Sequence, residues 1–156
     1  MTKLWMLGCV LFVHALAGCG HSRDIDMAAA RKLSDALMAD WIAHRPDSAL
    51  DKMKPEFTGM IKRSDFAPQL EKLSQYCGWP LDIELMDIQS GFTISSDGHK
   101  NPIRKFIYAA TTTQFSKGQC YFAVVVVPSG DTLKVTSFGP CTDVSQCVVW
   151  VVPFLQ

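Results

Sequence analysis

Three titratable side chains of this chain could serve acid–base chemistry. Asp40 and His44 lie near the end of a first predicted helix, and Asp87 lies on a first predicted strand. Such groups act as general acids or bases when burial and neighbouring charges move their pKa, which would suit a small isomerase or hydrolase using Asp87 or Asp40. Each also has an ordinary interpretation as a solvated helix-end or outward strand group, which the sequence favours. Because no GxSxG, HExxH, CxxC or glycine-rich phosphate loop is present, no catalytic residue, metal or cofactor is predicted.

Cysteines are the second group with chemistry of its own. Four of the six lie in the second half of the chain, namely Cys77, Cys120, Cys141 and Cys147. An even number of cysteines in an exported domain predicts disulfides, and four cysteines allow three connectivities. Four reduced thiols are the alternative. Their spacing lacks the paired ligands of a zinc site, which argues against a structural metal.

The N-terminal segment has the layout of an export signal. Lys3 precedes an apolar run over residues 4–15, and small residues lead to Cys19. This is the pattern of a secretory signal, and the run is shorter than the roughly 20 apolar residues that span a bilayer. The sequence Leu16-Ala17-Gly18-Cys19 resembles the box of bacterial lipoproteins. An ordinary signal peptide that contains a cysteine, or a buried N-terminal helix, is the alternative.

The lipoprotein resemblance implies a lipid anchor. It predicts that residues 1–18 are removed as a signal peptide and that Cys19 becomes the lipidated first residue, carrying diacylglyceryl and an acyl chain such as palmitate. Gly20, rather than aspartate, follows this cysteine, which by the same resemblance favours the outer membrane facing the periplasm. Residues 19–26 are then a short lipidated tether, and the domain is expected to lie close to the membrane surface.

The balance of charged residues limits the classes of partner that the chain could bind. The chain has 15 basic and 15 acidic side chains, and the leader holds only Lys3, so the mature part is close to neutral. No basic stripe is present to attract nucleic acid, and nucleic-acid binding is therefore not expected. Residues 27–156 are enough for one domain with a substantial core, and they are predicted to form one.

Hydrophobic periodicity predicts helices first and strands afterwards. Helices are expected over residues 27–44, about 48–53 and 65–77, with Asp26 as the first N-cap and Gly78 as a stop. Four later segments are rich in β-branched and aromatic side chains and are predicted to be strands: residues 82–95, 103–116, 119–128 and 132–139. Because their connections are short, the strands should form an antiparallel meander. The prediction is an α+β domain with the helices on one face of a curved sheet.

This element order resembles the nuclear transport factor two-like, or cystatin-like, cone fold. Three local features add to the likeness: Lys54-Pro55-Glu56-Phe57, the helix carrying Phe66, Leu70, Leu73 and Gly78, and Asp131-Thr132-Leu133-Lys134-Val135 at the last hairpin. The likeness covers residues 27–139. It implies a cone-shaped domain, in a superfamily that includes isomerases and dehydratases. Val148 to Phe154 exceeds the pattern and is interpreted as an added strand or an apolar flap.

Two-residue turns at Lys117-Gly118 and Ser129-Gly130 would fix the strand register. Side chains alternate across a strand, so one uncharged face would carry Thr111, Thr113, Phe115, Cys120, Phe122, Val124, Val126, Leu133, Val135 and Ser137. With Trp41 from the first helix, most of these residues are expected to line a pocket under the helices, and Phe138 is expected on the opposite face. A core-facing Cys77 would then pair with Cys120, which leaves Cys141 and Cys147 as a local loop.

The sequence therefore predicts a noncatalytic envelope lipoprotein that binds a protein partner or an apolar small ligand. A periplasmic immunity-type inhibitor of a toxin is one version of the protein-partner alternative, and the small isomerase or hydrolase is the rival. The uncharged run Val148 to Phe154 is expected to be a buried strand or a contact surface for a partner or a second copy of the chain.

Overall fold

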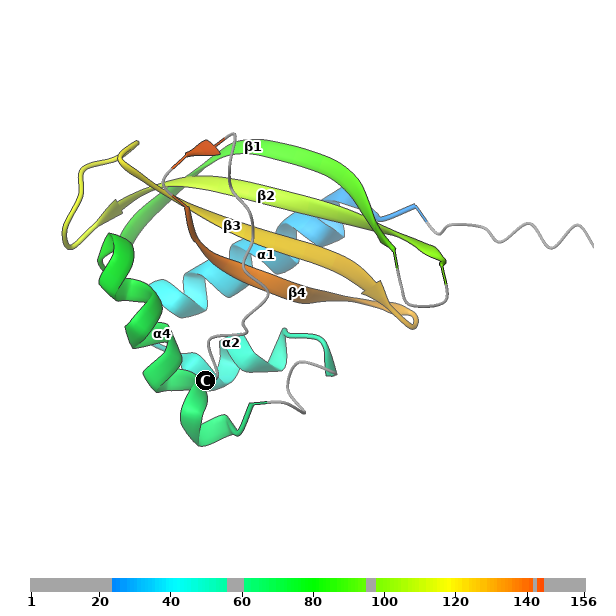
Figure 1. Cartoon of the computed structure of the whole chain (residues 1–156), viewed down its shortest axis with the longest axis horizontal. Helices are drawn as coiled ribbons and strands as arrows, with labels where there is room; N and C mark the ends of the chain where they lie inside the picture. Colours follow the sequence, from blue (N-terminus) through cyan, green and yellow to red (C-terminus); the bar gives the residue numbers. More distant parts are fainter. Residues whose placement is uncertain (1–23, 56–60, 95–97, 142, 145–156) are drawn as a thin grey trace, which may run out of the picture.

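The computed structural model describes residues 24–55, 61–94, 98–141 and 143–144 (Figure 1). Its elements, in chain order, are α1 (Met27–Ile42), α2 (Pro46–Asp51), α4 (Arg63–Cys77), β1 (Pro80–Ile94), β2 (Lys100–Thr112), β3 (Cys120–Ser129) and β4 (Thr132–Cys141). The strands form one antiparallel sheet in the order β1-β2-β3-β4. The helices pack on one face of this bent sheet (Figure 1). The predicted α+β meander is therefore confirmed.

Local signals set the two ends of α1. The Asp26 carboxylate accepts from the N–H groups of Ala28 at 2.9 Å and Ala29 at 3.3 Å, as predicted for an N-cap. The helix ends at Ile42, two residues earlier than expected, and His44 follows in the left-handed region with φ 54°. Pro46 then occupies the first turn of α2, where its missing N–H costs no hydrogen bond.

A disulfide joins α4 to the sheet. Cys77 and Cys120 are bonded with their Cα atoms 5.9 Å apart, which is the pairing predicted from the sequence. The chain leaves α4 at Gly78, whose φ of 77° suits glycine. Cys141 is also disulfide-bonded, and Cys147 lies outside the described residues.

The register of β2 against β3 differs from the predicted one. The observed pairs are Ala110–Cys120, Tyr108–Phe122 and Phe106–Val124. Thr111 therefore faces away from the helices, and Thr113 and Phe115 lie beyond the end of β2 in an exposed loop. The placement of these three residues with Phe122 and Val124 was wrong.

Local hydrogen bonds explain the longer connection. The Thr112 hydroxyl accepts from the N–H groups of Gln114 at 3.2 Å and Phe115 at 2.9 Å, which ends the strand. Thr113 is held by Trp79, the residue directly before β1. The Thr113 N–H donates to the Trp79 carbonyl and the Trp79 N–H donates to the Thr113 hydroxyl, both at 2.9 Å. The turn therefore spans residues 113–119 instead of two residues.

A β-bulge reverses the facing predicted for two residues of β4. The register shifts between Val125 and Val126, so Ser137 pairs with Val125 and Phe138 pairs with Val124. Phe138 consequently faces the helices and is buried in the core, whereas Ser137 lies on the opposite side. The sequence predicted the reverse, because simple alternation does not reveal an inserted residue.

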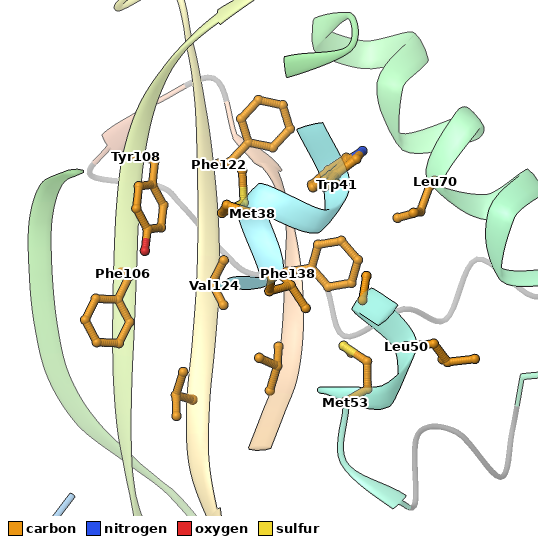
Figure 2. Packing of buried hydrophobic residues seen from close by; sticks show 14 of the residues in the cluster. Met38, Trp41, Leu50, Met53, Leu70, Phe106, Tyr108, Phe122, Val124 and Phe138 are labelled. Carbon is orange, nitrogen blue, oxygen red and sulfur yellow. The ribbon is translucent and has the colours of Figure 1, made fainter. Parts of the chain in front are cut away.

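The helix-facing side of the sheet is filled by side chains. Trp41 of α1 makes edge contacts with Phe122 at 4.8 Å and Phe138 at 5.2 Å between ring centroids (Figure 2). A third edge contact joins Trp41 to Trp79, with centroids 6.3 Å apart. Trp41, Phe122 and Val124 are each 0 % exposed. These three predicted pocket residues therefore form the packed core between helix and sheet, and they do not line an open pocket.

Candidate functional site

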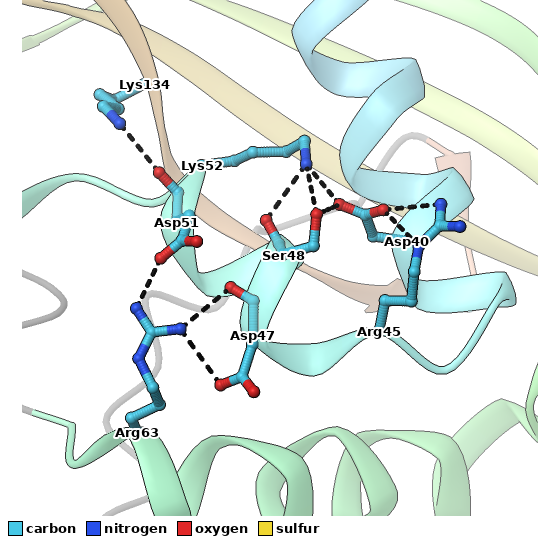
Figure 3. A network of polar contacts seen from close by, with 8 residues as sticks. All are labelled: Asp40, Arg45, Asp47, Ser48, Asp51, Lys52, Arg63 and Lys134. Carbon is cyan, nitrogen blue, oxygen red and sulfur yellow. Dashed lines mark hydrogen bonds and ion pairs between the residues drawn. The ribbon is translucent and has the colours of Figure 1, made fainter.

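Asp40 lies at the centre of a polar network between α1 and α2 (Figure 3). Arg45 donates to its Oδ1 from Nε at 2.9 Å and from Nη2 at 2.8 Å. The Ser48 hydroxyl donates to Oδ2 at 2.6 Å, and the Lys52 ammonium binds the same oxygen. Asp40 is 4 % exposed, so the predicted solvated helix-end position is wrong.

The Asp40 carboxylate is held in its charged form. Burial raises its pKa, but the hydrogen bonds from Lys52, Ser48 and Arg45, together with the Lys52 charge, outweigh burial and hold the pKa below its ordinary value. A general base near neutral pH needs a raised pKa and a free lone pair directed at a substrate. Because both oxygens of Asp40 already accept from side chains, its geometry suits a clamp between two helices.

The other two candidate acid–base residues, His44 and Asp87, are engaged in local packing and local hydrogen bonds. The His44 ring stacks on Trp79 with centroids 4.0 Å apart and planes at 4°, which uses its apolar face for packing. Asp87 is exposed on β1, where its carboxylate accepts from the Ile88 N–H at 2.8 Å and from the Gln89 amide at 2.9 Å. The structure does not bring Asp40 and Asp87 together in one site.

A second buried polar contact crosses the core. The Tyr108 hydroxyl of β2 lies 2.7 Å from the Ser34 hydroxyl and 2.8 Å from the Asp35 carboxylate, both on α1. Burial raises the pKa of Tyr108 well above its ordinary value, and Asp35 adds to the rise. The phenol thus stays protonated and serves as a hydrogen-bonding group that positions α1 on the sheet.

Within the described ranges, no three His, Cys, Asp or Glu side chains gather closely enough to hold a metal ion. Across those same ranges, no helix combines the length and apolar character needed to cross a membrane. Three features singled out in the sequence lie outside the described residues: Cys19, Cys147 and the run Val148 to Phe154.

A hollow of about 440 Å³ lies where the chain enters α1 and where the β3–β4 hairpin turns. Its apolar walls come from Ile25 and Leu33 on one side and from Pro128 and Leu133 on the other. Asp40 lies about 20 Å along the helix from Asp26, because fourteen residues rise by 1.5 Å each. The hollow and the Asp40 network are therefore separate features.

Acidic groups surround the apolar walls of the hollow. Asp24, Asp26 and Asp131 line it and are exposed, and none of its lining residues is basic. A volume of this size falls within the range of small-ligand sites, which combine apolar walls with a few polar groups. The arrangement can hold an apolar group and favours a neutral or cationic one over an anion.

The sequence contained a partial signal for this hollow. Ile25 precedes the N-cap Asp26 and is 5 % exposed in the main core cluster together with Ala30. An apolar residue in that position commonly packs on the fourth helical residue and fixes the angle at which the chain enters the helix. The packed domain therefore includes Ile25, which the sequence assigned to the tether. Proximity to the β3–β4 hairpin could not be predicted.

Comparison with known proteins leaves the site to be interpreted from its own residues. The chain matches no family model, no curated protein and no solved structure.

Proposed function

We propose that this chain is an exported lipoprotein of the bacterial envelope, anchored through acyl chains on Cys19 after removal of residues 1–18. Its domain is a noncatalytic binding module of the cystatin-like cone type. The module binds a small apolar ligand or an apolar segment of a protein partner in the hollow between the start of α1 and the β3–β4 hairpin. The expected location is the periplasmic side of the outer membrane.

One observation carries the binding role: a hollow of about 440 Å³ with apolar walls lies at the end of the domain next to the proposed anchor. Of the polar groups described above, Asp40 and Tyr108 are engaged inside the fold, and the exposed Asp87 carboxylate accepts from neighbours on its own strand. Asp40 accepts from three side chains, and the Tyr108 hydroxyl is bonded to α1. A carboxylate that is paired in this way and has a lowered pKa is a poor general base, which favours binding over an isomerase or hydrolase that uses Asp40.

A neutral apolar fluorophore, N-phenyl-1-naphthylamine, tests the binding role. Ala29 lines the hollow from an exposed position on α1, so Ala29→Trp should fill it without disturbing the core. Its exposed neighbour Ala28 is not among the lining residues, so Ala28→Trp is the matched control. We expect Ala29→Trp to weaken dye binding roughly tenfold, since it removes apolar contacts, and Ala28→Trp to leave it unchanged. Equal binding by the two variants would refute a ligand site in the hollow.

The anchor is tested by mass spectrometry and fractionation of the full chain expressed in a diderm bacterium. The N-terminal peptide should begin at Cys19 and carry acyl chains, and the protein should sediment with outer membranes. Cys19→Ala should abolish acylation and remove the protein from the outer-membrane fraction, because one residue carries the lipid. A wild-type N-terminal peptide without acyl chains would refute the anchor independently of the dye result.

A further inference from the structure

The end of the domain at which the described chain begins also exposes large apolar side chains. Phe92 and Ile94, at the end of β1, are 55 % and 66 % exposed, and Met27 in the first turn of α1 is 39 % exposed. Figure 1 shows that the end of β1 and the start of β2 lie at the same end of the molecule as residues 24–26. The exposed apolar groups and the entry point of the chain therefore share one end.

Phe92 and Ile94 form an amphipathic edge with the neighbouring strand. They lie four and six residues after Ile88, on the same side of β1, and Ile88 itself packs against the core. Ile94 pairs with Lys100 of β2, and the Lys100 ammonium lies 4.6 Å from the centroid of the Phe92 ring. An aromatic ring, an aliphatic side chain and a cation thus lie together at the tip of the sheet.

This combination fits the surface of a phospholipid bilayer. Aromatic side chains and lysine gather at the level of lipid headgroups, where apolar groups reach the acyl chains and cations meet phosphates. Neighbouring charges also select the orientation. Three aspartates and no basic residue line the hollow beside the β3–β4 hairpin, whereas the β1–β2 tip carries Lys100 together with Asp97, so an anionic surface repels the tip less than the hollow.

The length of the tether limits how far this end of the domain can lie from the membrane. Five residue steps separate Cys19 from Asp24, the first described residue, and a fully extended chain of that length spans about 17 Å. A lipid on Cys19 would therefore keep this end of the domain within a short distance of the headgroups. Such tethering gives weak apolar contacts a high effective concentration of bilayer surface.

We infer that Phe92, Ile94 and Lys100 form a membrane-contact edge that inserts at headgroup level beside the lipid anchor and orients the domain on the bilayer. The inference rests on the proposed acylation of Cys19. It adds a specific surface and a defined partner, the phospholipid bilayer. The acidic hollow then opens next to the membrane surface instead of being pressed against it.

Site-specific photo-crosslinking of the full, acylated chain tests this edge. Benzoylphenylalanine is incorporated in place of Phe92 in one protein and in place of Phe115 in the matched control. Phe115 is 39 % exposed in the loop at the opposite end of the sheet (Figure 1). Both proteins are reconstituted in vesicles of phosphatidylethanolamine and phosphatidylglycerol at three to one, irradiated, and analysed by mass spectrometry for lipid adducts. The Cys77–Cys120 disulfide, detected in nonreducing gels, reports correct folding of both.

The expected result is a yield of lipid adducts roughly tenfold higher at position 92 than at position 115, because only the former is held at the headgroups. Equal yields in acylated, vesicle-bound protein would overturn the membrane-contact edge while leaving the anchor intact. Protein adducts in place of lipid adducts at position 92 would also overturn it and indicate a protein interface. A mass of the N-terminal peptide without acyl chains would remove the anchor and the edge together.

Discussion

Replacing Asp40 with asparagine should lower the free energy of unfolding by about 2–4 kcal/mol. The asparagine keeps the oxygen that Ser48 and Lys52 share, but it removes the negative charge that pairs with Lys52 and places amide hydrogens where Arg45 donates. A hydrogen bond to a charged group contributes about 1.5–3 kcal/mol, and this range applies to Lys52, whose side chain is only 21 % exposed. Arg45 is 58 % exposed and can return to water, so its ion pair adds only about 0–1 kcal/mol.

A double-mutant cycle with Asp40→Asn and Lys52→Met, followed by urea unfolding, isolates the central pair. We expect a coupling free energy of about 2 kcal/mol, because the two groups share a buried contact. Arg63→Ala is the control, since Arg63 pairs with Asp47 at 3.1 Å and Asp51 at 2.5 Å while remaining 55 % exposed. Arg63→Ala should lower the free energy of unfolding by less than about 1 kcal/mol. A coupling below about 0.5 kcal/mol would refute the role assigned to this network.

The same carboxylate predicts a difference at acid pH. The pKa of Asp40 is held below its ordinary value in the folded state, so the carboxylate contributes stability above the unfolded pKa of about 4. This contribution is lost as the pH falls through the lower folded pKa. Wild type should therefore lose more stability than Asp40→Asn between about pH 5 and pH 2 in urea titrations. Parallel curves would show that Asp40 is not stabilised as a carboxylate.

Three further variants, and Gly118→Ala as a control for the third, test other parts of the fold. Cys77→Ala with Cys120→Ala should cost about 4 kcal/mol in urea unfolding, because the bridge closes a separation of 43 residues; a loss below about 1 kcal/mol would contradict this. Tyr108→Phe should lower the free energy of unfolding by about 1–2 kcal/mol. The raised pKa of Tyr108 also means that wild type loses stability as the pH rises above about 10, with the ultraviolet absorbance showing that this phenol ionises only on unfolding. Gly78→Ala should cost about 2 kcal/mol or more, because its Cβ would lie 2.7 Å from the Thr113 hydroxyl, whereas Gly118→Ala, with φ 86° and open space, should cost only about 1 kcal/mol.

Local chemistry made much of the architecture predictable. Asp26 and Gly78 mark helix ends through hydrogen bonds and backbone angles that depend on a few neighbouring residues. The β-branched runs placed all four strands within a few residues of their observed bounds. The Cys77–Cys120 pair also followed, because apolar periodicity set the facing of the helix and alternation set that of β3.

The candidate site was less predictable because it depends on contacts between distant segments. Ile25 and Leu133 are more than 100 positions apart and line one hollow only because the fold brings the start of α1 near the β3–β4 hairpin. Asp40 likewise depends on Lys52, which reaches it only after the chain turns at His44 and enters α2. Neither burial nor partner is encoded in the spacing of such residues.

By itself, the sequence determined the order and type of the elements, because hydrophobic period, caps and turn residues act over a few positions. Tertiary structure alone decided which residues of β2 and of the second half of β4 face the helices. The loop at residues 113–119 and the bulge near Val125 each change the pairing register, and a shift of one residue moves a side chain to the other face. Those shifts turned a predicted uncharged pocket into a packed core and left the open hollow at the end where the described chain begins.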